Sequence, residues 1–135
     1  MSDTAPCVLV VEDEAGAREV ICDTLDAEGY RALGVADGSE AVRVLEGQLA
    51  NDQRPCVILL DLMMPGMNGW QFREWQRRDP RFAEIPVVLL SAVRDLHDEA
   101  RKLAAAGFLA KPVKFEVLLG EIERHCGPCN GRAAG

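Results

Sequence analysis

Four short apolar runs, each leading into a charged or hydroxyl side chain, constrain the fold of this chain most strongly. In chain order, the runs and the residues after them are Val8–Val11 with Glu12-Asp13, Val57–Leu60 with Asp61, Val87–Leu90 with Ser91, and Phe108–Ala110 with Lys111. Apolar runs of this length, separated by helical patterns, are typical of buried parallel strands. Ligands bind outside the carboxyl ends of the strands in an open parallel sheet. We therefore expect these polar side chains to gather at one edge of a sheet.

Helical patterns fill the segments between the runs, and a weaker strand is expected at 30–35. The other expected strands are 7–11, 56–60, 87–90 and a short one after Gly107, and the expected helices are 15–28, 39–49, 70–77, 94–106 and 114–126. This alternation predicts an α/β fold, a doubly wound five-stranded parallel sheet flanked by five helices. We expect a single domain over 1–126 and a C-terminal tail over 127–135.

The charged side chains at the predicted edge suggest a particular chemistry. Glu12, Asp13 and Asp61 would bring three carboxylates together, and Mg²⁺ prefers such oxygen ligands. Mg²⁺ beside an ammonium from Lys111 and a hydroxyl from Ser91 is suited to a phosphoryl group. The pattern therefore predicts a phosphoryl-handling site.

Composition excludes several other classes of function. The formal net charge is −7 and the isoelectric point is about 4.8, which argues against direct binding to nucleic acid or to an anionic membrane. No apolar run approaches the roughly 18 residues of a membrane span, and residues 1–4 lack the basic start of a signal peptide. We expect a cytoplasmic protein. Five cysteines in a chain of this size do not suggest a disulfide framework.

Four sequence fragments together resemble the receiver domain of bacterial two-component response regulators. The fragments are Val11-Glu12-Asp13-Glu14, Asp61-Leu62-Met63-Met64-Pro65-Gly66-Met67-Asn68-Gly69, Ser91-Ala92 and Lys111-Pro112. The resemblance covers about residues 7–125 and implies the flavodoxin-like receiver fold. It also implies a stand-alone signalling switch rather than an enzyme.

The resemblance implies a phosphoryl-accepting role for Asp61. The donor would be a phosphohistidine on a histidine kinase or a histidine phosphotransfer protein. Asp13, Asp61 and the backbone carbonyl of Met63 would ligate Mg²⁺, and Glu12 would hold it through water. Output would be contact with a downstream protein target or onward phosphotransfer.

The resemblance also implies roles at the other end of the site. Lys111 would pair with Asp61 and then with the phosphoryl oxygens, and Ser91 would donate a hydrogen bond to one of them. Phe108 stands at the switch aromatic of the family, and the Lys111–Pro112 peptide is expected to be cis. Met63 and Val93 occupy positions that flank the path of the hydrolytic water, which predicts slow loss of phosphate.

Two other functions are compatible with parts of the pattern. A Mg²⁺-dependent phosphatase of the haloacid-dehalogenase type also uses an Asp at a strand end. That family places a second Asp two residues later, where this chain has Met63, which cannot do acid–base work. A receiver-like protein that is never phosphorylated is a further alternative, against which the complete set of site residues argues.

Some residues are expected to have structural roles. Glu12-Asp13 alone could be the solvated start of a helix, Asp61 a turn residue and Ser91 an N-cap. Phe108 is expected to be a core aromatic, and the first helix to bury Val20, Ile21 and Leu25. Where dimerising receivers carry acidic residues before the switch aromatic, this chain has Ala104–Gly107. That difference argues against their charged dimer.

The motif Cys126-Gly127-Pro128-Cys129 has the spacing of a thioredoxin redox site. It follows a predicted helix instead of starting one, so the helix dipole would not favour a thiolate there. Redox catalysis is therefore disfavoured, while a disulfide within the tail or a metal site with His125 stays open. Cys7, Cys22 and Cys56 are expected to be packing residues.

Overall fold

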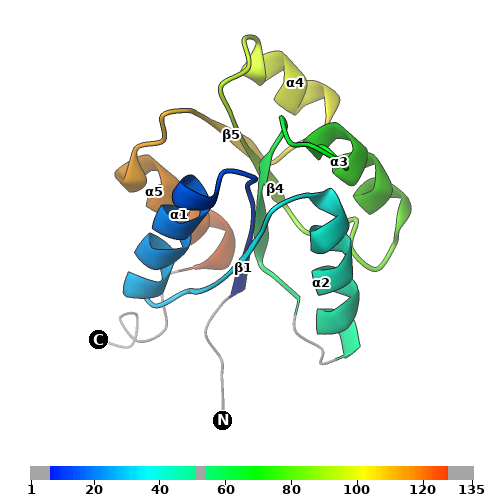
Figure 1. The fold of residues 1–135 in the computed structure, drawn as a ribbon, viewed down its shortest axis with the longest axis horizontal. Coiled ribbons are helices and arrows are strands. Elements are labelled where there is room, and N and C mark those ends of the chain that lie inside the picture. The colour runs from blue at the N-terminus through cyan, green and yellow to red at the C-terminus, as the bar shows by residue number, and fades with distance from the viewer. Residues whose placement is uncertain (1–6, 51–53, 128–135) are drawn as a thin grey trace.

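The computed structural model describes residues 7–50 and 54–127, which form one parallel sheet with helices on both faces (Figure 1). The strands lie in the order β2-β1-β3-β4-β5, with every neighbouring pair parallel. This confirms the predicted fold class. The strands are β1 Cys7–Val11, β2 Arg31–Val35, β3 Val57–Asp61, β4 Val87–Ser91 and β5 Gly107–Ala110. The helices are α1 Ala15–Ala27, α2 Gly38–Ala50, α3 Gly69–Arg78, α4 Leu96–Lys102 and α5 Phe115–Cys126.

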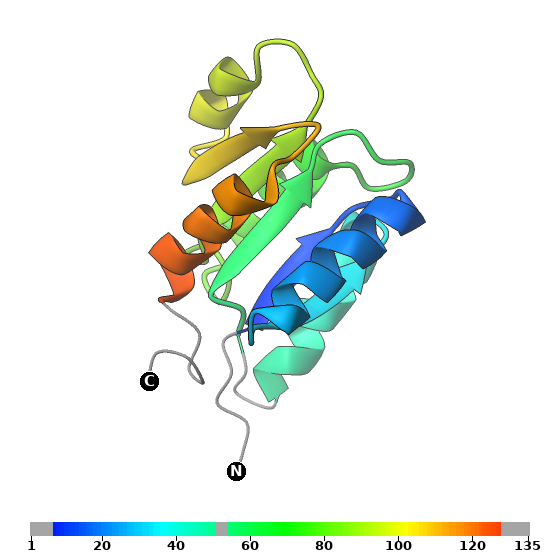
Figure 2. The same cartoon turned by 90° about the vertical axis from the view of Figure 1, so that its left-hand side faces the viewer.

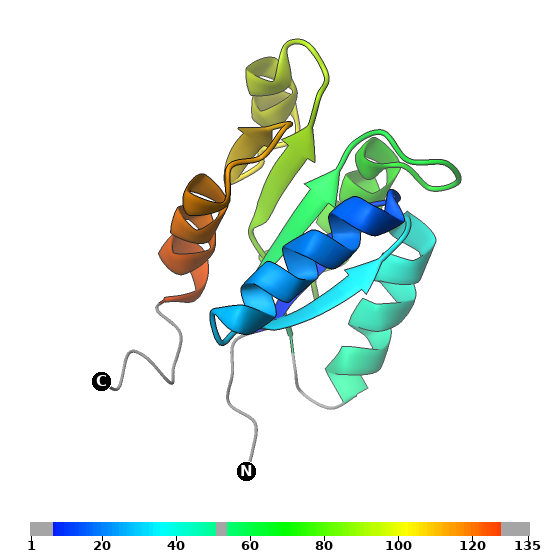
Figure 3. The same cartoon turned by 60° about the vertical axis from the view of Figure 1, so that its left-hand side comes forward.

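In the described part of the chain, two helices cover one face of the sheet and three cover the other. Figures 2 and 3 show α1 and α5 side by side in front of the strands. Ile21 and Leu25 of α1 pack with Leu118 and Ile122 of α5 in one apolar layer beneath them. Because both faces are covered, β1, β3 and β4 are buried along their whole length, which explains their continuous apolar sequences.

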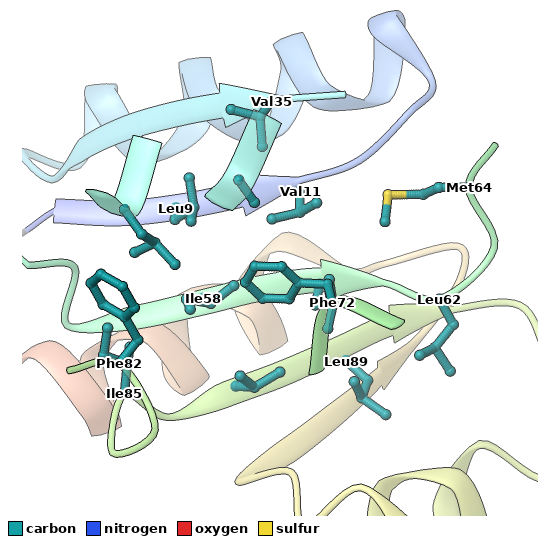
Figure 4. Close-up of a cluster of buried hydrophobic side chains, with 14 of the residues drawn as sticks. Leu9, Val11, Val35, Ile58, Leu62, Met64, Phe72, Phe82, Ile85 and Leu89 are labelled. Carbon is teal, nitrogen blue, oxygen red and sulfur yellow. The ribbon is translucent and has the colours of Figure 1, made fainter. Parts of the chain in front are cut away.

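The second apolar layer lies between the sheet and α2, α3 and α4 (Figure 4). Phe72 of α3 and Phe82 of the loop before β4 are fully buried there, against strand residues such as Leu9 and Ile58. Trp75 stacks on Phe82 with ring centroids 5.5 Å apart. The central strands are therefore fixed from both sides, and their carboxyl ends point to the same edge.

Local capping places helix starts next to that edge. The Glu14 side chain accepts a hydrogen bond from the Ala17 backbone N–H, which caps α1 directly after β1. Asn68 and Gln71 form a capping box at the start of α3. Glu14 comes three residues after the end of β1 and Asn68 seven residues after the end of β3, so side-chain hydrogen bonds order the point where each loop enters its helix.

The fourth helix ends earlier than its sequence predicts. The alanine-rich pattern predicted a helix over 94–106, whereas α4 ends at Lys102 and Ala104 has a positive φ of 53°. The end is a Schellman motif, in which the Ala104 N–H donates to the Arg101 carbonyl and the Ala105 N–H to the Ala100 carbonyl, and the Ala106 N–H donates to the Val87 carbonyl of β4. Arg73 of α3, which is 6% exposed, donates hydrogen bonds to the carbonyl oxygens of Leu103 and Ala104 at 2.8 and 2.9 Å. Arg73 therefore holds the turn that follows α4 against α3.

Two apolar side chains lie differently from their predicted positions. Val20, predicted inward on α1, is 50% exposed, because α1 turns that part of its surface toward the groove beside α5. Phe108, predicted as a core aromatic, is 39% exposed. It lies on an edge strand, where its ring contacts His97 of α4 at a centroid distance of 5.4 Å.

The cysteines also differ from the prediction. Cys56, expected to be a packing residue, forms a disulfide with Cys126, so Cys126 pairs with a strand and not within the tail. Cys7 and Cys22 are free thiols, as expected. Of the predicted tail over 127–135, the structure describes Gly127. The rest of the tail, including Cys129, lies outside the described residues. Among the helices that the structure describes, none is long and apolar enough to cross a membrane.

Arg73→Ala is expected to lower the free energy of unfolding by about 2–3 kcal/mol. The substitution removes the three hydrogen bonds that the guanidinium donates, and it leaves the carbonyl oxygens of Leu103 and Ala104 without this donor. Urea unfolding measures this change. Arg78→Ala is the matched control on the same helix, since Arg78 makes an exposed ion pair with Glu74 whose loss costs about 0.5 kcal/mol. Equal effects of the two substitutions would contradict the role given to Arg73.

Candidate functional site

Three carboxylates meet at the carboxyl ends of β1 and β3. Glu12 and Asp61 are 0% and 3% exposed, and Asp13 is half-buried beside them. One oxygen from each of the three lies within 4.8 Å of the others. The strands β1 and β3 are neighbours in register, so the fold itself brings these acids together. The juxtaposition expected from the strand ends is confirmed.

The Lys111 ammonium lies between two of these carboxylates. Its Nζ donates hydrogen bonds to Oε1 of Glu12 at 2.7 Å and to Oδ2 of Asp61 at 2.9 Å. Burial disfavours the ammonium, but the hydrogen bonds with Glu12 and Asp61 outweigh burial and raise the pKa of Lys111 above its ordinary value. Lys111 is therefore a stable cation that offsets part of the negative charge of the cluster.

Backbone contacts position Lys111 beside Asp61. Its N–H donates to the carbonyl oxygen of Ser91 at 3.0 Å, which continues the pairing of β5 with β4 past the strand end. The following peptide, Lys111–Pro112, is cis, as the resemblance to receiver domains implies. Ser91 is 1% exposed, and its Oγ accepts a hydrogen bond from the Val93 N–H at 3.3 Å. The hydroxyl thus stands at the same edge as Asp61 and Lys111.

The loop after β3 wraps around Asp61. The Met63 N–H donates to Oδ1 of Asp61 at 3.2 Å, and the Met63 side chain is 60% exposed. At the far end of the loop, the Gly69 N–H donates to the Leu62 carbonyl at 3.1 Å. Added at Gly69, a Cβ would clash with the carbonyl oxygen of Asp61 and with Cα of Leu62. Only glycine allows α3 to begin this close to the acid.

Two contacts at the site were not predicted from the sequence. Oε2 of Glu12 accepts a hydrogen bond from the Glu14 N–H at 3.1 Å, and its backbone carbonyl accepts one from Arg18 at 2.8 Å. They hold Glu12 in place directly after β1. The acceptor for Arg18 is a backbone oxygen, which every residue carries, so the sequence holds no signal for that contact.

Phe108 is the one predicted functional residue that lies apart from the cluster. It stands three residues before Lys111 on β5, with its ring toward α4. The structure thus places six predicted residues at one edge, namely Glu12, Asp13, Asp61, Met63, Ser91 and Lys111, and the seventh, Phe108, on the neighbouring surface. The arrangement can hold a cation among carboxylates and can offer an ammonium and a hydroxyl to an anionic group.

The response regulator receiver domain family matches residues 8–123 of this sequence. The chain belongs to that family. Receiver domains are signalling modules, not catalysts in the usual sense. A curated relative, the phosphate regulon transcriptional regulatory protein PhoB of Escherichia coli, is 36% identical over 118 residues. That match covers 86% of this chain and 49% of the relative, so the chain spans about half the length of the curated relatives it matches.

Solved receiver domains have the same fold. The receiver domain of a signal transduction histidine kinase from Syntrophus aciditrophicus is 33% identical, with a TM-score of 0.76 and 90% coverage of both chains. The receiver domain of sensor histidine kinase PA1611 from Pseudomonas aeruginosa is 30% identical, with a TM-score of 0.79, covering 92% of this chain and 99% of its own. In that protein a magnesium ion is coordinated in the active site cleft.

Gly69→Ala is expected to destabilise the protein by about 1–3 kcal/mol, because the added methyl group meets backbone atoms that cannot move aside without shifting Asp61. Thermal unfolding measures the change. Gly120→Ala is the matched control, since a Cβ there, on the exposed side of α5, meets nothing within 4 Å, and alanine favours the helix by about 1 kcal/mol. A stable Gly69→Ala protein would show that the close approach is not required.

Proposed function

We propose that this chain is a phosphorylation-dependent signalling switch of a two-component system or phosphorelay, with Asp61 as the phosphoacceptor. The observation that carries the proposal is the Lys111 ammonium, hydrogen-bonded to Glu12 at 2.7 Å and to Asp61 at 2.9 Å. A cation in this place can transfer a charge-assisted hydrogen bond from the carboxylate to an oxygen of an attached phosphoryl group. The receiver family supports the same role for Asp61.

Mg²⁺ is the proposed cofactor. Asp13, Asp61 and the backbone carbonyl of Met63 would hold it directly, and Glu12 would hold it through water. The donor set fits, because it consists of carboxylate and carbonyl oxygens, and the half-buried Asp13 leaves the cluster open to solvent. When bound, Mg²⁺ neutralises charge on the phosphoryl oxygens.

The proposed reaction is the transfer of a phosphoryl group from a phosphohistidine. A carboxylate oxygen of Asp61 attacks phosphorus, the phosphorus–nitrogen bond of the donor breaks, and an acyl phosphate forms on Asp61. Lys111 then pairs with one phosphoryl oxygen, and the Ser91 hydroxyl donates to another. The donor is a histidine kinase or a histidine phosphotransfer protein, because receiver domains have histidine kinases as partners.

The new phosphate adds roughly one to two negative charges next to Ser91 and Lys111. Movement of Ser91 toward that charge would leave room for Phe108, which contacts His97 of α4 across a partly exposed surface. The proposed output is a change on the surface of α4, β5 and α5, recognised by a downstream protein target, or onward phosphotransfer.

Direct contacts with nucleic acid and with membranes are not part of the proposal, because the net charge of −7 disfavours both. The proposed compartment is the cytoplasm, since receiver domains are generally cytoplasmic. The proposed receiver unit is residues 1–126, with 127–135 as its tail. The alternative phosphatase would need an acid–base group two residues after Asp61, where Met63 offers a thioether.

Acetyl phosphate with Mg²⁺ is expected to add one phosphoryl group to the protein, and the product should be labile to hydroxylamine. Intact-mass spectrometry and peptide mapping measure the modification. Asp61→Asn should abolish it, because an amide cannot accept the phosphoryl group. Asp23→Asn, an exposed position on α1, is the matched control and should be modified like the wild type. Modification that persists in Asp61→Asn would place the acceptor elsewhere.

Replacing Met63 with Asn and Val93 with Glu is expected to speed the loss of phosphate by about tenfold, the equivalent of about 1.4 kcal/mol in the barrier. Asn and Glu can hydrogen-bond the attacking water, whereas a thioether and an isopropyl group cannot do so well. The decay of purified phosphoprotein, followed after removal of acetyl phosphate, measures this rate. If the wild type and the double variant lost phosphate at the same rate, Met63 and Val93 would not be slowing hydrolysis by excluding water.

A further inference from the structure

A disulfide joins the start of the central strand to the end of the last helix. Cys56, directly before β3, is bonded to Cys126, the last residue of α5, seventy positions later in the chain. Their Cα atoms are 5.4 Å apart, within the range that a disulfide spans without movement of the backbone. The bond lies at the amino end of the strands, opposite the edge that carries Asp61.

Contacts other than the sulfur bond already hold the two backbones in place. The Cys56 N–H donates to the Cys7 carbonyl at 2.9 Å, which fixes the start of β3 beside β1. The Tyr30 hydroxyl donates to the Gly127 carbonyl at 2.9 Å, directly after Cys126, which fixes the end of α5. The fold therefore presents the two sulfur atoms to each other before they bond.

Both redox states of the pair fit this environment. The Cys56 sulfur is 3.2 Å from the Cys7 carbonyl oxygen, so a reduced thiol has a hydrogen-bond acceptor within reach. Cys56 and Cys126 are half-buried at the rim of the apolar layer beneath α5, whereas the free thiol of Cys7 is buried. The pair is therefore less deeply buried than the thiol of Cys7.

We propose that Cys56 and Cys126 form a reversible redox site, which a small-molecule disulfide of the glutathione class oxidises and a dithiol reduces. One cysteine thiolate attacks the small disulfide, forms a mixed disulfide and releases one thiol. The other cysteine thiolate then attacks the mixed disulfide and expels the second thiol. Two electrons pass to the reagent, and the protons of the two cysteines end on the released thiols.

The consequence of oxidation would be a restraint on α5. Leu118 and Ile122 hold this helix on the sheet by apolar packing, the Tyr30 hydroxyl adds one hydrogen bond at its end, and the disulfide adds a covalent link there. In the reduced state, the last turns of α5 are free to open locally, because packing at the end of a helix is the first to yield. Oxidation would therefore bias an element of the proposed output surface, by chemistry that does not involve Asp61.

The test uses the full chain, equilibrated with oxidised or reduced glutathione, then alkylated and digested without reduction. We expect the oxidised protein to yield a peptide pair linked through Cys56 and Cys126. It should also melt about 10 °C above the reduced protein. Peptides linked through Cys126 and Cys129, or equal melting temperatures of the two states, would overturn the proposal. Comparing two states of one chain avoids any dependence on a variant that fails to fold.

Variants locate the effect. Cys56→Ser and Cys126→Ser should each abolish the difference in melting temperature, and Cys22→Ser, at a half-buried free thiol on α1, should retain it. Tyr30→Phe should lower the equilibrium constant for disulfide formation by about fivefold, because it loses one hydrogen bond that holds α5 in place. If Cys22→Ser lost the difference in melting temperature between the oxidised and reduced protein, the assignment of the redox site to Cys56 and Cys126 would be overturned.

Hydrogen exchange separates this site from phosphorylation. Amides in the last turns of α5 should exchange faster in the reduced protein, in the wild type and in Asp61→Asn alike. Equal exchange in both redox states would contradict the restraint on α5. Because Asp61→Asn cannot accept a phosphoryl group, the redox result stands or falls independently of the proposed signalling role.

Discussion

The pairing of Lys111 with Glu12 and Asp61 is the interaction on which the site depends. Two buried carboxylates a few ångströms apart repel each other, and burial removes the water that would otherwise screen them. One ammonium bonded to both offsets part of that cost, and the remaining negative charge attracts a cation. The same side chain therefore permits the acids to be buried and prepares the cluster for an anionic group, so stability and chemistry are difficult to separate at this position.

The sheet makes that pairing possible. Lys111 is fifty residues from Asp61 and ninety-nine from Glu12, and only the order β1-β3-β4-β5 brings their strand ends to one edge. The apolar layers on both faces hold the strands in register, and the caps of α1 and α3 fix the starts of these helices beyond the strand ends. A site assembled from four strand ends needs a rigid frame, and the buried central strands supply it.

The sequence predicted most of the fold and the juxtaposition at the site, because both depend on apolar runs and on the polar residue at the end of each run. Its errors share a cause, which is tertiary contact. The early end of α4 accompanies the pairing of the Ala106 N–H with Val87 of β4, and the exposure of Phe108 depends on how far α4 covers an edge strand. The Cys56–Cys126 bond joins positions seventy residues apart, and no local pattern indicates such a pairing.

The hydrogen bonds of Arg73 constrain the side chain on α3, but they do not constrain the side chains of the turn after α4. Both carbonyl oxygens that it binds, at Leu103 and Ala104, belong to the backbone, so the side chains there can change without loss of the hydrogen bonds. Arg73 itself has no such freedom, since no other side chain offers a planar set of donors that reaches both oxygens. The side chains after α4 can therefore change in evolution while the buried guanidinium continues to hold the backbone of that turn in place.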